Sequence, residues 1–138
     1  MNKEEIDLMK NLRPIDYAVT CSMGGTPGDT VEATFVINRS DFAVCSIQYA
    51  VLGDDGTDPQ QFLLDWSEQN TIKYNKSQNG LHAQIYGSVR HGIWKEYVPP
   101  INLALNTTVF IKLTNVYAAA GNQRNIQVVF SGYETKRE

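Results

Sequence analysis

Hydrophobic and polar side chains alternate along the second half of the chain. Within residues 107–115, Val109, Ile111 and Leu113 fall on one face, and most residues of the other face are polar. The stretch Asn125–Tyr133 repeats this pattern after a polar loop that contains glycine. A period of two residues is typical of a strand with one buried face. We therefore predict two antiparallel strands joined by a long hairpin connection.

The first half of the chain predicts more strands. Ile15–Met23 and Thr30–Asn38 both alternate, and a dense turn signal separates them at residues 24–29. Phe42–Leu52 is largely apolar on both faces, as in a central strand that is covered from two sides. Shorter strands are expected around Phe62–Trp66, Ile72–Tyr74, His82–Tyr86 and Ile93–Trp94.

The number and spacing of these runs predict the fold class. Turn signals recur about every 10–15 residues and separate about eight or nine strands, which indicates an all-β, two-sheet antiparallel β-sandwich of jelly-roll type. Because proline donates no backbone hydrogen bond, Pro99 and Pro100 place their segment at an edge or a corner. The alternating positions predict the following core residues: Val19, Phe35, Ile47, Leu64, Ile111, Leu113, Val128 and Phe130.

The N-terminal residues carry the one helical pattern that we recognise. Ile6, Leu8, Met9 and Leu12 are apolar, and the acidic residues between them suit the positive end of a helix dipole. Pro14 ends the pattern, and so short a helix is not stable alone. We therefore expect an assembly arm that orders on a neighbouring molecule or packs on its own domain, with a frayed terminus as the simpler alternative.

Length and composition indicate one globular domain. The chain has 138 residues, of which 42% are hydrophobic and 20% are charged. We expect a helical arm over residues 1–13 and a single β-sandwich over residues 14–138. The net charge is −3 and no basic field is present, so nucleic acid is not an expected partner. No apolar run resembles a signal peptide or a membrane span, so we expect no membrane partner and folding in the cytoplasm.

Candidate metal ligands are sparse. The two histidines, His82 and His91, are too few for the three or four ligands of a zinc or iron site. Asp54, Asp55 and Asp58 lie in a glycine-containing loop, where clustered carboxylates can hold calcium. Their spacing does not match a calcium loop, so a solvated turn is the favoured interpretation.

Candidate nucleophiles are equally sparse. Cys21 and Cys45 lie in apolar strand patterns, where we expect two free, buried thiols; a disulfide between neighbouring strands is the minor alternative. The chain has no G-x-S-x-G motif. We therefore predict that the protein is not an enzyme and has no catalytic residues, no cofactor and no required metal.

Several aromatic residues lie in the middle of the chain. Trp66, Tyr86, Trp94 and Tyr97 could form an exposed platform that stacks against sugar rings. They could equally anchor the core or a protein interface. A carbohydrate-binding or receptor-binding β-sandwich module is therefore the alternative function.

The segment from Tyr97 to Tyr133 carries a family resemblance. It contains a proline-led apolar stretch, Y-V-P-P-I-N-L-A-L-N, then a strand that ends in L-T-N, a loop, and a last strand N-I-Q-V-V-F-S-G-Y. This order resembles the C-terminal strands of small jelly-roll virion proteins of tailed and icosahedral bacteriophages. The resemblance implies a structural subunit of a capsid, vertex, decoration or head–tail connection. It implies other virion proteins and copies of the chain itself as partners, with synthesis in the host cytoplasm and no catalytic residues.

Overall fold

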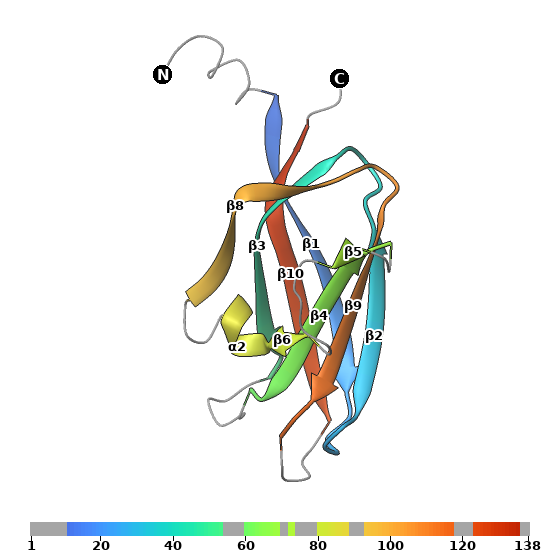
Figure 1. The fold of residues 1–138 in the computed structure, drawn as a ribbon, viewed down its shortest axis with the longest axis vertical. Coiled ribbons are helices and arrows are strands. Elements are labelled where there is room, and N and C mark those ends of the chain that lie inside the picture. Colours follow the sequence, from blue (N-terminus) through green and yellow to red (C-terminus); the bar gives the residue numbers. More distant parts are fainter. Residues whose placement is uncertain are drawn as a thin grey trace.

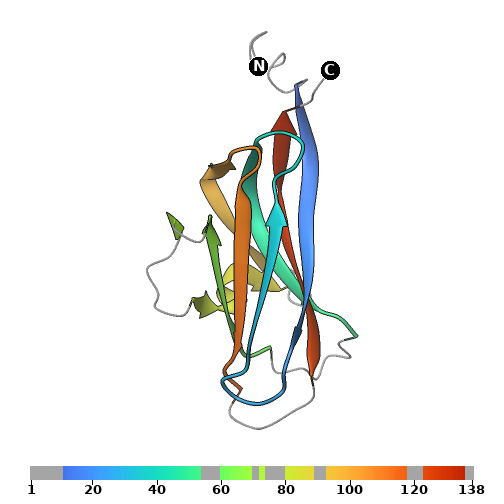
Figure 2. The ribbon, with the colours of Figure 1, turned by 90° about the vertical axis from the view of Figure 1, so that its right-hand side faces the viewer.

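The structure is a computed structural model that describes residues 11–53, 60–69, 72–73, 80–88, 93–117 and 123–135. Two sheets pack face to face in an all-β sandwich (Figures 1 and 2). The first sheet has the order β1 (Leu12–Met23), β10 (Arg124–Thr135), β3 (Phe42–Val51), β7 (Gly87–Ser88) and β8 (Ile93–Leu103). The second has the order β2 (Thr30–Val36), β9 (Thr108–Asn115), β4 (Phe62–Glu68) and β5 (Ile72–Lys73), and β6 (Leu81–His82) also pairs with β4.

The pairing is antiparallel throughout the described strands, except for the single contact between β3 and β7. β1 and β10 pair along their whole length, from Leu12 opposite Thr135 to Met23 opposite Arg124. The start of β1 and the end of β10 therefore lie together at one end of the sandwich (Figure 1). We call this end, with the β2–β3 and β8–β9 turns, the terminal end.

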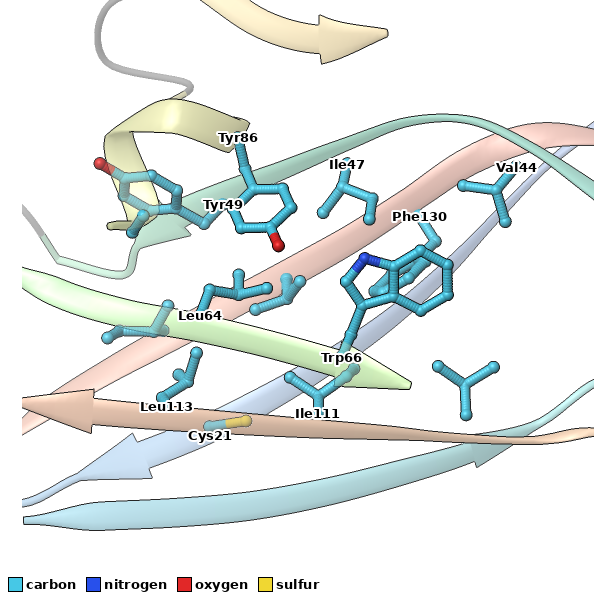
Figure 3. Packing of buried hydrophobic residues seen from close by; sticks show 14 of the residues in the cluster. Cys21, Val44, Ile47, Tyr49, Leu64, Trp66, Tyr86, Ile111, Leu113 and Phe130 are labelled. Carbon is cyan, nitrogen blue, oxygen red and sulfur yellow. The ribbon is translucent and has the colours of Figure 1, made fainter. Parts of the chain in front are cut away.

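The core lies between the sheets and largely matches the prediction. Six of the eight predicted core residues are buried, whereas Val19 and Phe35 are half-buried and pack against the core. These two lie on β1 and β2, the edge strands, where fewer neighbours cover a side chain. Figure 3 shows how the two sheets interdigitate. The largest fully buried side chains are aromatic ones that the prediction left out of the core: Trp66, Tyr49, Tyr86, Phe42 and Phe62.

The strand β1 corrects one part of the arm prediction. Leu12 is the first residue of β1 and is not part of an arm, and Pro14 lies inside this strand instead of ending a helix. An edge strand tolerates proline because one side of it needs no backbone donor. The remaining arm residues Ile6, Leu8 and Met9, together with the predicted helix, lie outside the described residues.

Residues 82–86 correct a strand prediction. Ala83–Tyr86 form one helical turn, α2, and the Nδ1 atom of His82 accepts a hydrogen bond from the Gln84 backbone N–H at 3.3 Å. Ala83 and Tyr86, three residues apart, are buried, whereas Ile85 is exposed. So short an apolar run fits a helical period and a strand period equally well. In the structure, the helical turn buries Ala83 and Tyr86 on one face.

A bulge explains why β3 is apolar on both faces. Phe42 and Val44 point inward, and Ile47 and Tyr49 do so as well, so the inward phase changes between Val44 and Ser46. The register to β10 and the register to β8 both shift at this point. A β-bulge adds one residue to a strand and re-aims its side chains. The broken period therefore reflects a bulge at Cys45.

The paired prolines lie opposite the same bulge. Glu96 pairs with Ser46 and Ile101 pairs with Val44, so Pro99 and Pro100 fall in the unpaired interval between these positions of β8. Because β8 is the last strand of its sheet, the expected edge position is confirmed. Val98, directly before the prolines, is 88% exposed.

Candidate functional site

The terminal end of the sandwich contains a cavity of about 440 Å³, which we call the terminal pocket. It lies where the start of β1, the end of β10, the start of β3 and the end of β8 come together. Its lining consists of Leu12, Asp41, Phe42, Ala43, Asn102, Leu103, Ala104, Tyr133 and Thr135.

The strand register explains how the pocket forms. Leu12 pairs with Thr135, and Ala43 pairs with both Tyr133 and Asn102. Directly paired residues point to the same face of a sheet, so these side chains share the outer face of the first sheet. Ala43 has a small side chain between the larger ones and leaves a hollow there. The pocket is therefore a depression that opens on the outer face and reaches the core residues Phe42 and Leu103.

A buried carboxylate lies on the inner face at the same end. The side chain of Glu134 is fully buried, and its Oε1 accepts a hydrogen bond from Arg13 Nε at 3.0 Å. The same oxygen accepts a second hydrogen bond from Arg39 Nη2. No described residue donates to Oε2 of this carboxylate. The two ion pairs join β1, β10 and the β2–β3 turn, and so hold together the elements that frame the pocket.

Aromatic side chains fill the space beneath these ion pairs. The ring of Tyr17 stacks on Phe35 with centroids 5.2 Å apart and meets Phe42 at 4.8 Å. Burial, above all, raises the pKa of Tyr17, and the nearby Glu134 carboxylate raises it further, against the opposing effects of the Asn38 backbone and Arg39. Phe42 belongs both to this cluster and to the lining of the pocket, so the pocket has a firmly packed base.

Gly132 permits the close packing of β10 on β3 at this end. A Cβ atom at this position would lie 1.8 Å from the carbonyl oxygen of Ala43 and 3.1 Å from the Phe42 ring. The glycine lies at the register shift between the two strands. The Gly-Tyr pair that ends the resembling segment thus has a structural cause, because residue 132 must lack a side chain and Tyr133 faces outward.

The structure places two of the four candidate aromatic residues in the core. Trp66 and Tyr86 are each 1% exposed, so they take the core position that the sequence left open and offer no surface to a ligand. Their rings fill the space between the sheets, and Trp66 meets Phe130 edge to face with centroids 5.1 Å apart (Figure 3). A large apolar ring gains more free energy from burial than any other side chain, which favours this position.

Tyr97 is the described aromatic residue nearest to the surface in this group. It is half-buried, and its hydroxyl accepts a hydrogen bond from Trp66 Nε1 at 3.3 Å. Burial raises the pKa of Tyr97, and the bond from Trp66 lowers it by a smaller amount. Lys95 Nζ lies 5.8 Å from the Tyr97 ring centroid. Trp94 belongs to β8, but its side chain lies outside the described part of the chain.

The described residues offer little for catalysis by a metal or a thiol. None of the described His, Cys, Asp and Glu side chains forms a group of three or more that could hold a metal ion. His91, Asp54, Asp55 and Asp58 lie outside the described residues. Cys21 and Cys45 are free, and burial raises the pKa of both thiols, with a further contribution from Glu96 at Cys45. Raised pKa values disfavour the reactive thiolate.

Asn115 is a polar anchor at the opposite end of the sandwich. It is 2% exposed, and its amide nitrogen donates to the carbonyl oxygens of Gly24 and Thr26 at 3.2 and 3.3 Å. Its amide oxygen accepts from the Tyr117 N–H at 3.0 Å and from Arg124 at 3.1 Å. The asparagine of the L-T-N signature therefore joins the β1–β2 turn to the start of β10. The sequence marked this residue only through the resemblance.

Gln60 forms a second buried polar site, which the sequence did not indicate. It is 1% exposed, and its amide oxygen accepts hydrogen bonds from Tyr49 at 2.8 Å and from Ser88 at 3.0 Å. The three side chains connect β3, β7 and the segment before β4. A satisfied network of this kind stabilises a unique arrangement of strands and implies no chemistry by itself.

Comparison with known proteins adds no identification. No protein-family model, curated protein or solved structure matches this chain. Among the described residues, no helix has the length and apolar character needed to cross a membrane.

Proposed function

We propose that this protein is a structural subunit of a bacteriophage virion that acts by protein–protein assembly and catalyses no reaction. The observation that carries the proposal is the strand order. Successive long strands alternate between the sheets, which gives β1-β10-β3-β8 in one and β2-β9-β4 with the short β5 and β6 in the other. We take this order as support for a jelly roll, which is an eight-stranded arrangement of two Greek keys.

Jelly rolls serve as viral capsid domains, lectins and cupins, so the fold narrows the function without fixing it. A cupin-type metal enzyme lacks support because no cluster of three metal ligands exists among the described residues. Trp66 and Tyr86 are buried in the core, so they cannot contribute to a lectin-type platform for sugar binding. The capsid interpretation keeps the support of the family resemblance. The resembling segment forms β8, β9 and β10, in which Gly132 permits the close packing of β10 on β3 and Asn115 donates a hydrogen bond to the β1–β2 turn.

The surface also suits assembly. Val98 is 88% exposed on the edge strand β8, and Tyr133 is 45% exposed at the terminal end. We propose these two side chains as candidate contacts for a partner. We propose other virion proteins and copies of this chain as partners, without nucleic acid or membrane. In this proposal, the protein is made in the host cytoplasm and resides in the virion as a capsid, vertex, decoration or head–tail connection subunit.

Sedimentation velocity of the purified full-length chain tests this proposal. We expect concentration-dependent oligomers, whereas a chain that remains monomeric at every concentration would contradict self-assembly. A titration with a broad glycan panel, followed by tryptophan fluorescence, separates the alternative. Unchanged fluorescence is expected, and saturable quenching would favour a carbohydrate-binding or receptor-binding module.

A further inference from the structure

We propose that the open edge of β1 pairs with the β1 edge of a second copy of this chain, antiparallel and across a two-fold axis; this inference rests on the assembly role proposed above. β1 has 12 residues, so it runs for about 40 Å at about 3.3 Å per residue. Among the described strands, only β10 pairs with β1, and no strand pairs with its other edge (Figure 2, blue). Such an edge presents backbone N–H and C=O groups to which another strand can bind.

The edge of β1 lacks most of the features that keep an edge strand from pairing. Proteins protect edges with prolines, charges, bulges or short strands. The edge strand β8 has two prolines and a register shift, β5 has two residues, and β2 has seven residues and exposes Glu32. By contrast, β1 pairs with β10 without a register shift, and Asp16 is the only charged residue between Pro14 and Met23. Pro14 and Asp16 both lie in the first half of the strand, so its second half is unprotected.

Two observations show which residues of β1 direct their backbone groups to the open edge. Pro14 has no N–H to donate, and a strand tolerates proline where the nitrogen faces away from the sheet. Ser22 pairs with Asn125, whose carbonyl oxygen accepts a hydrogen bond at 2.8 Å from the N–H of Leu52, on the β3 side of β10. Asn125 therefore makes no ladder bond to Ser22. Because backbone groups alternate between the two edges of a strand, the even-numbered residues 16–22 direct theirs to the open edge.

One register satisfies all of these backbone groups. When the two-fold axis passes beside Val19, Asp16 lies opposite Ser22 of the second copy and Ala18 lies opposite its Thr20. Directly opposed residues of this kind exchange two hydrogen bonds, so the four pairs across the axis form about eight. Pro14 falls outside this ladder, and no charged side chain lies opposite a like charge.

The same register covers apolar side chains. Ile15, Tyr17 and Val19 face inward and are only half-buried, because no described strand lies beyond β1 in its sheet. In the proposed pair they lie opposite Met23, Cys21 and Val19 of the second copy. Apolar pairs across neighbouring strands stabilise a sheet. β1 is thus complementary to itself in hydrogen bonds, apolar side chains and charge, which favours a second copy over a strand of another protein.

An exchange of charges on the outer face of β1 tests this pairing. Ala18 and Thr20 are exposed, so substitutions there leave the core unchanged. A full-length chain with Ala18→Lys and Thr20→Lys places lysine opposite lysine, and its self-association in sedimentation velocity should be at least about tenfold weaker. A chain with Ala18→Glu and Thr20→Glu should be weakened similarly. An equimolar mixture of the two chains should restore association, because each lysine then lies opposite a glutamate.

Thr30 and Thr34, which are exposed on β2, provide the matched control for added charge. Chains with lysine or glutamate at both of these positions should associate like the unmodified chain, and thermal melting of every variant verifies its fold. Equal weakening by the β2 substitutions, undiminished association of the β1 lysine chain, or a mixture that does not recover would each overturn the pairing while the assembly role stands. An unmodified chain that stays monomeric would overturn both the pairing and self-assembly.

Discussion

Replacing Glu134 by glutamine should destabilise the terminal end of the sandwich. Glu134 is fully buried and accepts hydrogen bonds from Arg13 and Arg39, which come from two other segments of the chain. Glutamine keeps the size of the side chain but removes its charge. The substitution therefore weakens both ion pairs and changes the packing volume very little.

The expected loss of stability depends on how deeply the carboxylate and the two arginine side chains are buried. Removing one partner of a fully buried ion pair costs about 3–5 kcal/mol, and a hydrogen bond to a charged group contributes about 1.5–3 kcal/mol. Here the arginine side chains are 39% and 49% exposed, so water compensates for part of the loss. We expect a loss of about 1–2 kcal/mol in the free energy of unfolding. For a domain of this size, that corresponds to a decrease of about 3–10 °C in Tm.

Chemical denaturation of the full-length protein, followed by tryptophan fluorescence, measures this loss. Glu32→Gln is the matched control, because Glu32 is exposed on β2 and its substitution should change the stability by less than about 0.5 kcal/mol. A Glu134→Gln protein as stable as this control would show that the two ion pairs do not stabilise the terminal end. It would mean that the cost of burying the carboxylate cancels the attraction of the two arginines.

Four further outcomes are expected. Ile111→Asp should prevent cooperative folding, because an unpaired buried charge costs several kcal/mol against a total stability of about 5–15; a soluble protein with a cooperative thermal transition by circular dichroism would contradict the core assignment. Iodoacetamide should modify the half-buried Cys45 faster than Cys21, which is 2% exposed, and equal rates by mass spectrometry would argue against the β3 bulge geometry. Burial raises the pKa of both thiols above 9.0, so the folded state favours their protonated forms. Their contribution to the free energy of unfolding should therefore be fully present below about pH 9 and should be lost as the pH rises further. Denaturation curves at several pH values measure this, and a stability that increases at alkaline pH would contradict the predicted direction. Val98→Ser should leave Tm unchanged because Val98 is 88% exposed, but it should weaken oligomers if β8 takes part in assembly.

The alternation of apolar and polar residues predicted most of the strands and the fold class. β9 and β10 follow it closely, since the alternate apolar residues of both strands face the core: Val109, Ile111 and Leu113 in β9, and Ile126, Val128 and Phe130 in β10. The prolines of β8 also indicated their edge position correctly. These features depend on local periodicity and on backbone chemistry, which a sequence displays directly.

Other features depend on tertiary contacts that no local pattern displays. The bulge at Cys45 changed the inward phase of β3, and the packing of Ala83 and Tyr86 turned an expected strand into α2. Trp66 is equally suited to a ligand platform and to a core, and the assembled sheets placed it in the core.

The terminal pocket and the buried carboxylate were not predicted from the sequence. The pocket forms only where four strand ends come together, and no local sequence pattern distinguishes Ala43 and Ala104 of its lining from other alanines. One signal for the carboxylate was present, however. Glu134 continues the inward phase of β10 after Phe130, so an acidic residue occupies a position where the pattern calls for burial. A buried charge requires partners, and Arg13 and Arg39 supply them.

Mass spectrometry of gradient-purified particles from the source culture tests whether the protein is a virion subunit, as proposed above. We predict that this chain is present in every particle preparation, at a fixed ratio to the most abundant capsid protein and after removal of loosely bound material. A chain that is abundant in the soluble lysate but absent from the particles would contradict the proposed role as a virion subunit.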